Sequence, residues 1–274
     1  MSCENCFKGS ELPGTPTGTM VGDAYFAASP AGEAASEDQK KTAVVLLTDV
    51  FGLPMKNCKI LADILAQRLD VDVWVPDVFD GRPLAKVEEL EPLMPDRAGV
   101  AISFLARIRF FFLALFRLHI IYAIRPAVGA ERAKKFITML REEKGYEKVG
   151  AVGYCYGGIL CVMLGSTDIL DTVVIAHPGT VSLEQIKAMK IPASWACAEE
   201  DMSFKPRLRQ EAQAIFAARK EKPEFVDYEF RDYKGPCTAH GFAIRPNQSY
   251  PEVKAGYEGA LEQTVTWFKT KLSL

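Results

Sequence analysis

Short continuous apolar runs alternate along the chain with longer segments that repeat apolar positions at helical spacing. Each apolar run is typical of a strand buried on both faces of a parallel sheet. The runs cover 43–48, 71–75, 147–152, 172–176 and 191–198, and the helical segments cover 57–69, 128–144, 206–219 and 250–270. Strand, helix, strand at this spacing predicts an α/β architecture, a mostly parallel central sheet with helices on both faces.

The two ends of this pattern are less regular. A short strand pair is expected near 19–28, followed by a polar turn over 29–41, and residues 224–231 alternate like a further strand. Residues 1–18 are expected to form an irregular arm of one domain over 1–274. Cys3 and Cys6 form a C-x-x-C pair, but no second pair at suitable spacing follows, so no metal site is expected.

Residues 97–125 are very apolar and are interrupted by arginines at 107, 109, 117 and 125. The uncharged stretches are too short for a membrane-spanning helix, which needs about 20 residues. We expect an apolar helical insertion, a core or lid helix that packs over the active site. A surface amphipathic helix that touches a membrane and a dimer contact are the alternatives.

Composition narrows the class of protein. The 274 residues carry a formal net charge of −2, without the basic footprint of a nucleic-acid-binding protein. Seven cysteines, an odd number, and an N-terminus without the pattern of a signal peptide predict reduced thiols in the cytoplasm. The expected partner is a small molecule, with no nucleic acid, no membrane span and no cofactor, and the chain is expected to be a monomer or a homodimer.

Residues 147–160 (EKVGAVGYCYGGIL) contain the clearest chemical signal. A strand leads into a G-x-C-x-G turn, and a helix-like run follows. Glycines flank Cys155 because a strand that turns sharply into a helix leaves little room for side chains. Such a turn presents the sulfur above the sheet, next to the positive end of the helix dipole. A buried structural cysteine is the alternative.

Ligands of open parallel sheets bind outside the carboxyl ends of the strands. The polar residues that follow the predicted strands are Asp49, Asp77, Cys155, His177, Asp201 and His240. Cys155, Asp201 and His240 run nucleophile, acid, base, which is the chain order of α/β-hydrolases. The backbone amides of Tyr156, directly after the nucleophile, and of Val50, after an early strand, are the expected oxyanion donors.

Six segments of the chain resemble dienelactone hydrolase (carboxymethylenebutenolidase-like) proteins, which are α/β-hydrolases with a Cys-Asp-His triad. The combination is most similar to the fungal branch of that family. The matching segments are TDVFG (48–52), PDVFDGR (76–82), VGAVGYCYGG (149–158), AHPGT (176–180), ACAEEDMSF (196–204) and AHGFAIRP (239–246).

The resemblance implies roles for three further residues. Asp49 occupies the place of a family glutamate that influences protonation of the thiol, and its side chain is one methylene shorter. Arg82 and Arg245 match, with a shift of one residue in the loop, arginines that hold the substrate carboxylate. His177 is expected to have a structural role near the pocket.

The predicted activity is hydrolysis of small activated esters or enol-lactones through a thioester on Cys155. Two other families with a cysteine elbow fit less well. Glutamine amidotransferases pair it with H-x-E, whereas Gly241 and Phe242 follow His240, and the peptidase and deglycase family places histidine where Tyr156 stands. The alternative is a non-catalytic small-molecule-binding or interaction protein on the same fold.

Overall fold

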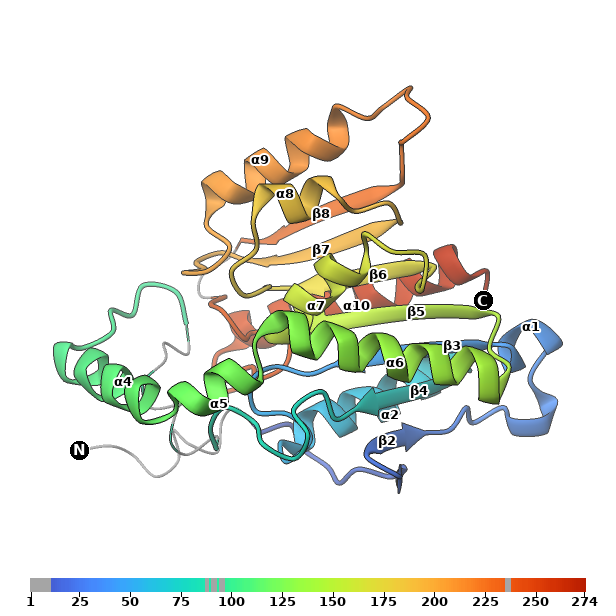
Figure 1. Cartoon of the computed structure of the whole chain (residues 1–274), viewed down its shortest axis with the longest axis horizontal. Coiled ribbons are helices and arrows are strands. Elements are labelled where there is room, and N and C mark those ends of the chain that lie inside the picture. The colour runs from blue at the N-terminus through green and yellow to red at the C-terminus, as the bar shows by residue number, and fades with distance from the viewer. Residues whose placement is uncertain (1–10, 87–88, 90–92, 94–96, 235–237) are drawn as a thin grey trace.

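A computed structural model describes residues 11–86, 89, 93, 97–234 and 238–274 of the chain (Figure 1). One eight-stranded sheet has the order β1-β2-β4-β3-β5-β6-β7-β8. The strands β3 to β8 pair in parallel, whereas β2 is antiparallel to both β1 and β4. The strands are β1 (Thr19–Val21), β2 (Ala24–Ala27), β3 (Thr42–Leu47), β4 (Asp72–Pro76), β5 (Lys148–Tyr154), β6 (Thr172–Ala176), β7 (Ala193–Ala198) and β8 (Tyr228–Tyr233).

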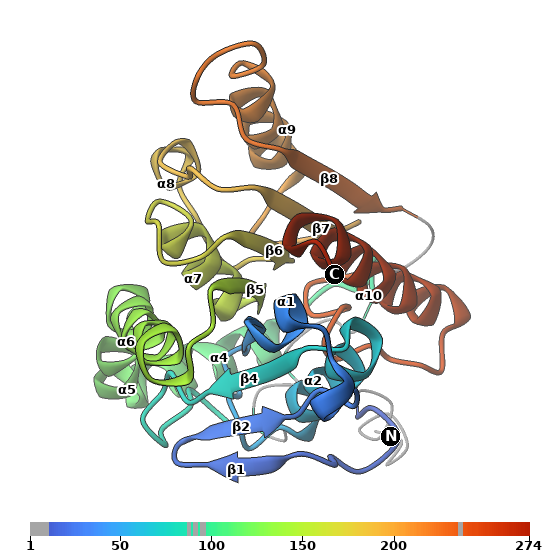
Figure 2. The same ribbon diagram turned by 90° about the vertical axis from the view of Figure 1, so that its right-hand side faces the viewer.

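Helices cover both faces of this sheet (Figure 2). Among the described residues they are η2 (Gly32–Ala34, a 3₁₀ helix), α1 (Glu37–Lys40), α2 (Lys56–Leu69), α4 (Phe104–Phe116), α5 (Leu118–Ala123), α6 (Pro126–Lys144), α7 (Tyr156–Leu164), α8 (Leu183–Lys187), α9 (Pro206–Ala217) and α10 (Pro251–Leu272). The α/β-hydrolase architecture expected from the sequence is therefore confirmed.

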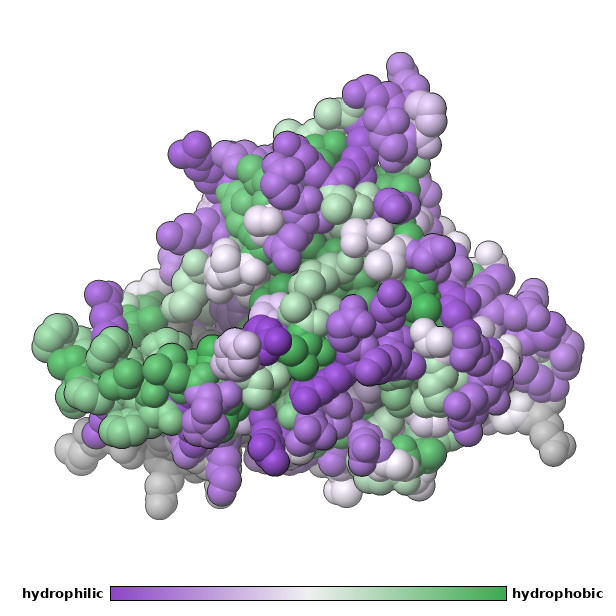
Figure 3. All heavy atoms as spheres, viewed as in Figure 1, coloured by the Kyte–Doolittle hydropathy of each residue, from purple (hydrophilic) through white to green (hydrophobic). Residues whose placement is uncertain are grey.

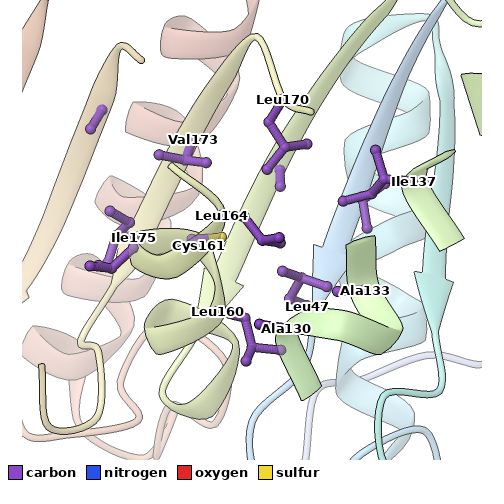
Figure 4. Packing of buried hydrophobic residues seen from close by; sticks show 14 of the residues in the cluster. Leu47, Ala130, Ala133, Ile137, Leu160, Cys161, Leu164, Leu170, Val173 and Ile175 are labelled. Atoms are coloured by element: carbon purple, nitrogen blue, oxygen red, sulfur yellow. The ribbon is translucent and has the colours of Figure 1, made fainter. Parts of the chain in front are cut away.

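Alternate residues of each central strand enter two separate cores, because side chains of a strand point to opposite faces. Val45 and Leu47 of β3 pack toward α6 and α7, and Val44 and Leu46 pack toward α2 and α10. Figure 4 shows Leu47 beside Ala130 and Ala133 of α6. Every residue of β3 is buried, as the continuous apolar run in the sequence predicts.

Local sequence accounts for several element ends. The helix α6 begins with Pro126 at its first position and ends at Gly145, which adopts the left-handed conformation that glycine tolerates best. Ser182 and Gln185 form a capping box that starts α8, a short helix that the apolar pattern misses. The last strand begins at Tyr228 instead of residue 224, because the chain still turns at Lys222–Phe225.

The expected insertion is helical, but α4 does not pack as predicted. None of its residues is buried, and the ribbon of α4 stands at one end of the molecule (Figure 1). A core helix is therefore not what the structure shows, whereas a role of α4 as a lid stays a prediction. The predicted C-x-x-C of Cys3 and Cys6 lies outside the described residues.

Candidate active site

Cys155 occupies the sharp turn between β5 and α7. Its backbone has φ 51° and ψ −106°, a conformation that is uncommon and strained for any residue other than glycine. Hydrogen bonds to the neighbouring strand and loop hold it there: its amide donates to the Ala176 carbonyl at 3.2 Å, and its carbonyl accepts from Gly179 at 2.9 Å. The fold thus supports a strained backbone at the residue that the sequence predicts as nucleophile.

The flanking glycines are required by close approach of backbone atoms. A Cβ on Gly153 would lie 2.2 Å from the Gly157 carbonyl oxygen, and one on Gly157 would lie 2.0 Å from the Leu47 oxygen. Both distances are far below van der Waals contact, and a backbone oxygen cannot move aside easily. These glycines let α7 start directly above β3 and β5.

His240 and Asp201 lie together at the carboxyl edge of the sheet. The Nδ1 atom of His240 lies 3.0 Å and 3.1 Å from the two carboxylate oxygens of Asp201. Asp201 Oδ1 also accepts the backbone amides of Ser203 and Phe204 at 2.8 and 3.1 Å. Both side chains are almost completely buried. The carboxylate is therefore held in place. Because it binds Nδ1 of the imidazole, Nε2 is the ring nitrogen left for another partner.

Cys155 is the other partner of this imidazole. Burial alone would lower the pKa of His240, but the electrostatic interaction with Cys155, the hydrogen bonds to Asp201 and Cys155 and the Asp201 charge raise it to about 10. Burial raises the pKa of Asp201, yet the hydrogen bond and charge of His240 and two backbone amides hold it below its usual range. The three predicted triad residues are thus brought together by the fold.

The two loops that carry Asp201 and His240 are joined backbone to backbone. Glu200 pairs with Ala239 in an isolated parallel bridge. The Glu200 amide donates to the Thr238 carbonyl at 3.1 Å, and the Glu199 amide donates to the Thr238 hydroxyl at 2.8 Å. This connection holds the loops of Asp201 and His240 together through backbone atoms, independently of the two side chains.

The expected oxyanion donors, the amides of Tyr156 and Val50, belong to adjacent segments. Tyr156 is the first residue of α7, where helix amides lack partners within the helix. The Gly157 amide donates to the Thr48 carbonyl at 2.9 Å, so the loop that carries Val50 runs beside the start of α7. The Tyr156 side chain points away from the sulfur, because its hydroxyl donates to the Ile124 carbonyl at 2.6 Å.

Four cysteines with free thiols lie within the described part of the chain, and they differ in exposure. Cys58, Cys161 and Cys197 are buried, whereas Cys155 is partly exposed. Burial raises the pKa of Cys58 and of Cys197 to about 12 and raises that of Cys161 further. A buried thiol of this kind is unreactive at neutral pH. Cys155 is therefore the described thiol that a reagent or substrate can reach.

Asp49 and Arg245, to which the resemblance gives separate roles, are paired with each other. The Nε atom of Arg245 donates to Asp49 Oδ2 at 2.9 Å, and only 6% of the arginine side chain and 1% of the aspartate side chain are exposed. The other Asp49 oxygen accepts the Phe51 amide, and the guanidinium lies 4.8 Å from the centre of the Phe51 ring. The Asp49 carboxylate is thus occupied by an arginine and an amide.

The chain is similar to a known family of hydrolases. A model of the dienelactone hydrolase family matches residues 119–272, more than half of the chain, including the elbow and both loops of the triad. The chain belongs to the dienelactone hydrolase family.

Relatives and solved structures agree with this assignment. The chain is 28% identical over 230 residues to the hydrolase pyvD of Aspergillus violaceofuscus, covering 84% of this chain and 81% of pyvD. It is 26% identical to the carboxymethylenebutenolidase homolog of Mus musculus, over 82% of this chain and 80% of that protein. A crystal structure of a proposed dienelactone hydrolase from Klebsiella pneumoniae shares the fold, with a TM-score of 0.60 at 13% identity and coverage of 89% and 91%.

In this member of the dienelactone hydrolase family, Arg82 lies apart from the three predicted triad residues. It is exposed and lines a cavity of about 400 Å³ together with Arg117, His119 and Arg132. None of the triad residues lines that cavity. Phe79 and Tyr156, whose ring centroids are 4.9 Å apart, connect the cavity wall to the elbow. The role of Arg82 in holding a substrate carboxylate stays a prediction.

His177 lies beside His240. It is completely buried, with φ 34°, and its ring centroid lies 5.2 Å from that of His240. Neither ring nitrogen has a hydrogen-bond partner on another described residue. Burial and, after it, the charge of His240 hold the pKa of His177 well below its usual value. The pKa values of these two neighbouring histidines are therefore shifted in opposite directions.

Sequence reasoning missed the Asp49–Arg245 pair. Both residues follow strands that end at the same edge of the sheet, and their opposite charges were the available signal. Their contact depends on the path of the loop after Gly241, which has φ 98° and lies against the Arg245 guanidinium. No cluster of three or more metal-ligating side chains occurs in the described ranges.

Proposed function

We propose that the protein hydrolyses small activated esters or enol-lactones, with Cys155 as nucleophile, His240 as base and acid, and Asp201 as the residue that orients His240. One observation carries this proposal: a partly exposed cysteine on a strained strand–helix turn meets a histidine whose other nitrogen is bound by a buried carboxylate. Nucleophile, base and orienting acid in this arrangement are the elements of covalent acyl transfer.

In the proposed reaction, the Cys155 sulfur adds to the carbonyl carbon of the substrate. The amides of Tyr156 and Val50 would stabilise the negative charge that develops on the carbonyl oxygen. The carbon–oxygen bond of the ester then breaks, His240 protonates the leaving oxygen, and a thioester remains on Cys155. Water activated by His240 attacks the thioester, releases the acid and restores the thiol.

The chemistry of sulfur favours particular substrates. A thiolate is itself a good leaving group, so the tetrahedral adduct of an amide or alkyl ester tends to expel sulfur and return to substrate. An enolate or aryl oxide leaves more readily than the thiolate, and the adduct then proceeds to the thioester. This reasoning supports activated esters and enol-lactones over peptides, and it agrees with membership in the dienelactone hydrolase family.

The test replaces Cys155 with Ala and measures turnover of p-nitrophenyl acetate. We expect turnover to fall by at least about a thousandfold, the scale of nucleophile removal in covalent hydrolases. Cys161→Ala is the matched control, because it also removes a thiol but leaves a buried position in α7 away from the triad. Equal turnover in Cys155→Ala and the unchanged protein would remove the cysteine from the mechanism.

A binding protein that has lost turnover is the competing function, and alkylation separates it from an enzyme. An activated Cys155 should react with iodoacetamide at neutral pH faster than a free thiol does.

A panel of aryl esters and lactones with and without a carboxylate then tests Arg82 and Arg245. Preference for the carboxylate that disappears in Arg82→Gln would support a substrate role of that arginine.

A further inference from the structure

The helix α4 presents an unusually apolar surface to solvent. Phe104, Phe111 and Phe116 are 79, 62 and 76% exposed, and Leu118 and Tyr122 of α5 extend the same surface. Figure 3 shows this region as a continuous hydrophobic area over α4. Scattered apolar side chains are normal on protein surfaces, but a contiguous patch of large ones marks an interaction site.

Most apolar side chains of α4 form one face with an arginine on each side, and Phe110, which is 48% exposed, lies outside that face. At 3.6 residues per turn, Phe104, Ile108, Phe111 and Leu115 follow one another along the outer face, and Leu105, Phe112 and Phe116 lie beside them. Arg107 falls on one border of this face and Arg109 on the other. The opposite side of the helix, with Leu113, packs against the small cluster of Phe51, Met55 and Ala85.

The arginines of residues 97–130 give this segment a positive charge. No acidic residue occurs between Arg97 and Ala130, although the whole chain has a net charge of −2. Arg117 binds Glu89 and the Leu84 carbonyl, and Arg125 binds the Tyr122 carbonyl. Arg107 and Arg109 are exposed, and their guanidinium groups make no hydrogen bond or ion pair with the described part of the chain.

We propose that α4 docks in the plane of an anionic lipid bilayer. Its phenylalanines and leucines would enter the boundary between headgroups and acyl chains, while Arg107 and Arg109 extend to lipid phosphates on both sides. A helix of 13 residues is too short to span a bilayer, and none in the described ranges is long and apolar enough to cross one. The helix therefore lies on the membrane.

Charge argues for lipid over a second copy of the chain. Two α4 faces brought together would gather four arginines, and the segment supplies no carboxylate to pair with them. An anionic membrane supplies a phosphate for each. The residues that lead into α4 also contact the loop of the catalytic acid, because the Gly99 amide donates to Glu200 Oε2 at 2.8 Å. Docking would thus tether the Asp201 loop to the membrane-bound helix.

Vesicle flotation of the full chain tests this proposal, which goes beyond the proposed activity and does not depend on it. Binding to phosphatidylcholine–phosphatidylserine vesicles is expected to exceed binding to pure phosphatidylcholine vesicles. Arg107→Gln combined with Arg109→Gln should lower the partition coefficient on anionic vesicles about thirtyfold. Phe104→Ser combined with Phe111→Ser should lower it by roughly tenfold per ring.

Matched controls come from residues outside α4 and α5. Phe225→Ser, at a phenylalanine that is 42% exposed, and Arg207→Gln, at an arginine whose side chain is 91% exposed, should bind vesicles like the unchanged chain. Circular dichroism verifies that each variant folds, as expected for positions without buried contacts. Cys155→Ala should also bind normally, which separates this test from that of the enzymatic proposal.

Two results would overturn the proposal. One is the absence of vesicle binding, or equal binding to neutral and anionic vesicles that ignores the arginine substitutions. The other is a concentration-dependent dimer, seen by light scattering, that Phe104→Ser with Phe111→Ser abolishes while vesicles bind nothing. The second result would assign the face to another copy of the chain.

Discussion

His177 and His240 occupy the same edge of the sheet and are both buried, yet their pKa values shift in opposite directions. Their ring centroids lie 5.2 Å apart. His240 meets Asp201 and Cys155, which together raise its pKa to about 10 against the opposing effect of burial. His177 is surrounded by the rings of Tyr154, Phe242 and His240, and burial lowers its pKa. The comparison teaches that a nearby anion, and not burial alone, decides whether a histidine here carries charge.

Removing the carboxylate is the strongest way to break this difference. Asp201→Asn should reduce turnover of p-nitrophenyl acetate by about a thousandfold or more, because His240 loses the partner that fixes its tautomer and stabilises its charge. The pKa of His240, followed by NMR, should fall toward that of His177. Asp77→Asn is the control, since Asp77 caps a turn at Phe79 and Gly81 on the same edge. Undiminished turnover in Asp201→Asn would contradict the assigned role.

A second experiment removes the anionic partner of another buried cation, Arg245. Asp49→Ala leaves the Arg245 guanidinium buried without its carboxylate, and unlike histidine, arginine cannot release its proton. The free energy of unfolding in urea should fall by about 3–5 kcal/mol. The double variant Asp49→Leu with Arg245→Met should recover most of that loss.

An exposed ion pair provides the control for this measurement. Glu262→Ala removes the partner of Arg68, where the carboxylate is 58% exposed, and should change the unfolding free energy very little. An equally small effect of Asp49→Ala would mean that Arg245 finds another partner or reaches water.

The smallest expected effect is the contribution of His177 to the loss of native stability at low pH. Below about pH 6.5, the unfolded chain binds a proton at this histidine that the native protein does not bind, so native stability decreases by about 1.4 kcal/mol per pH unit. The contribution is present above the unfolded pKa and is lost as pH falls. His177→Phe should flatten the decrease between pH 6.5 and 5, measured by urea unfolding at each pH.

His240 does not obscure that measurement. Its raised pKa adds stability that is fully present below about pH 6.5 and is lost only as pH rises toward about 10. His119→Phe serves as the control because His119 is exposed. An unchanged acid slope in His177→Phe would show that His177 is protonated in the native protein.

The sequence predicted the sheet and the positions of the catalytic candidates because these depend on local patterns. Continuous apolar runs mark strands that are buried on both faces, and glycines beside Cys155 mark a turn without room for side chains. The exposed position of α4 could not be predicted, since apolar composition indicates a partner without showing whether the partner belongs to the same chain. The Asp49–Arg245 contact depends on a loop path that no periodicity encodes.

The two glycines of the elbow have a consequence for how this site can vary. A Cβ atom on Gly153 or Gly157 would lie 2.2 or 2.0 Å from a backbone oxygen. The need for glycine at these positions therefore stays the same whichever atom performs the attack. Cys155 lies between them in a strained backbone conformation, and the reaction sets which atom its side chain carries. In evolution or in a directed library, oxygen could replace the sulfur at position 155 while the surrounding backbone stays unchanged. An added methyl group at Gly153 or Gly157 would prevent folding before any change of reaction could be selected.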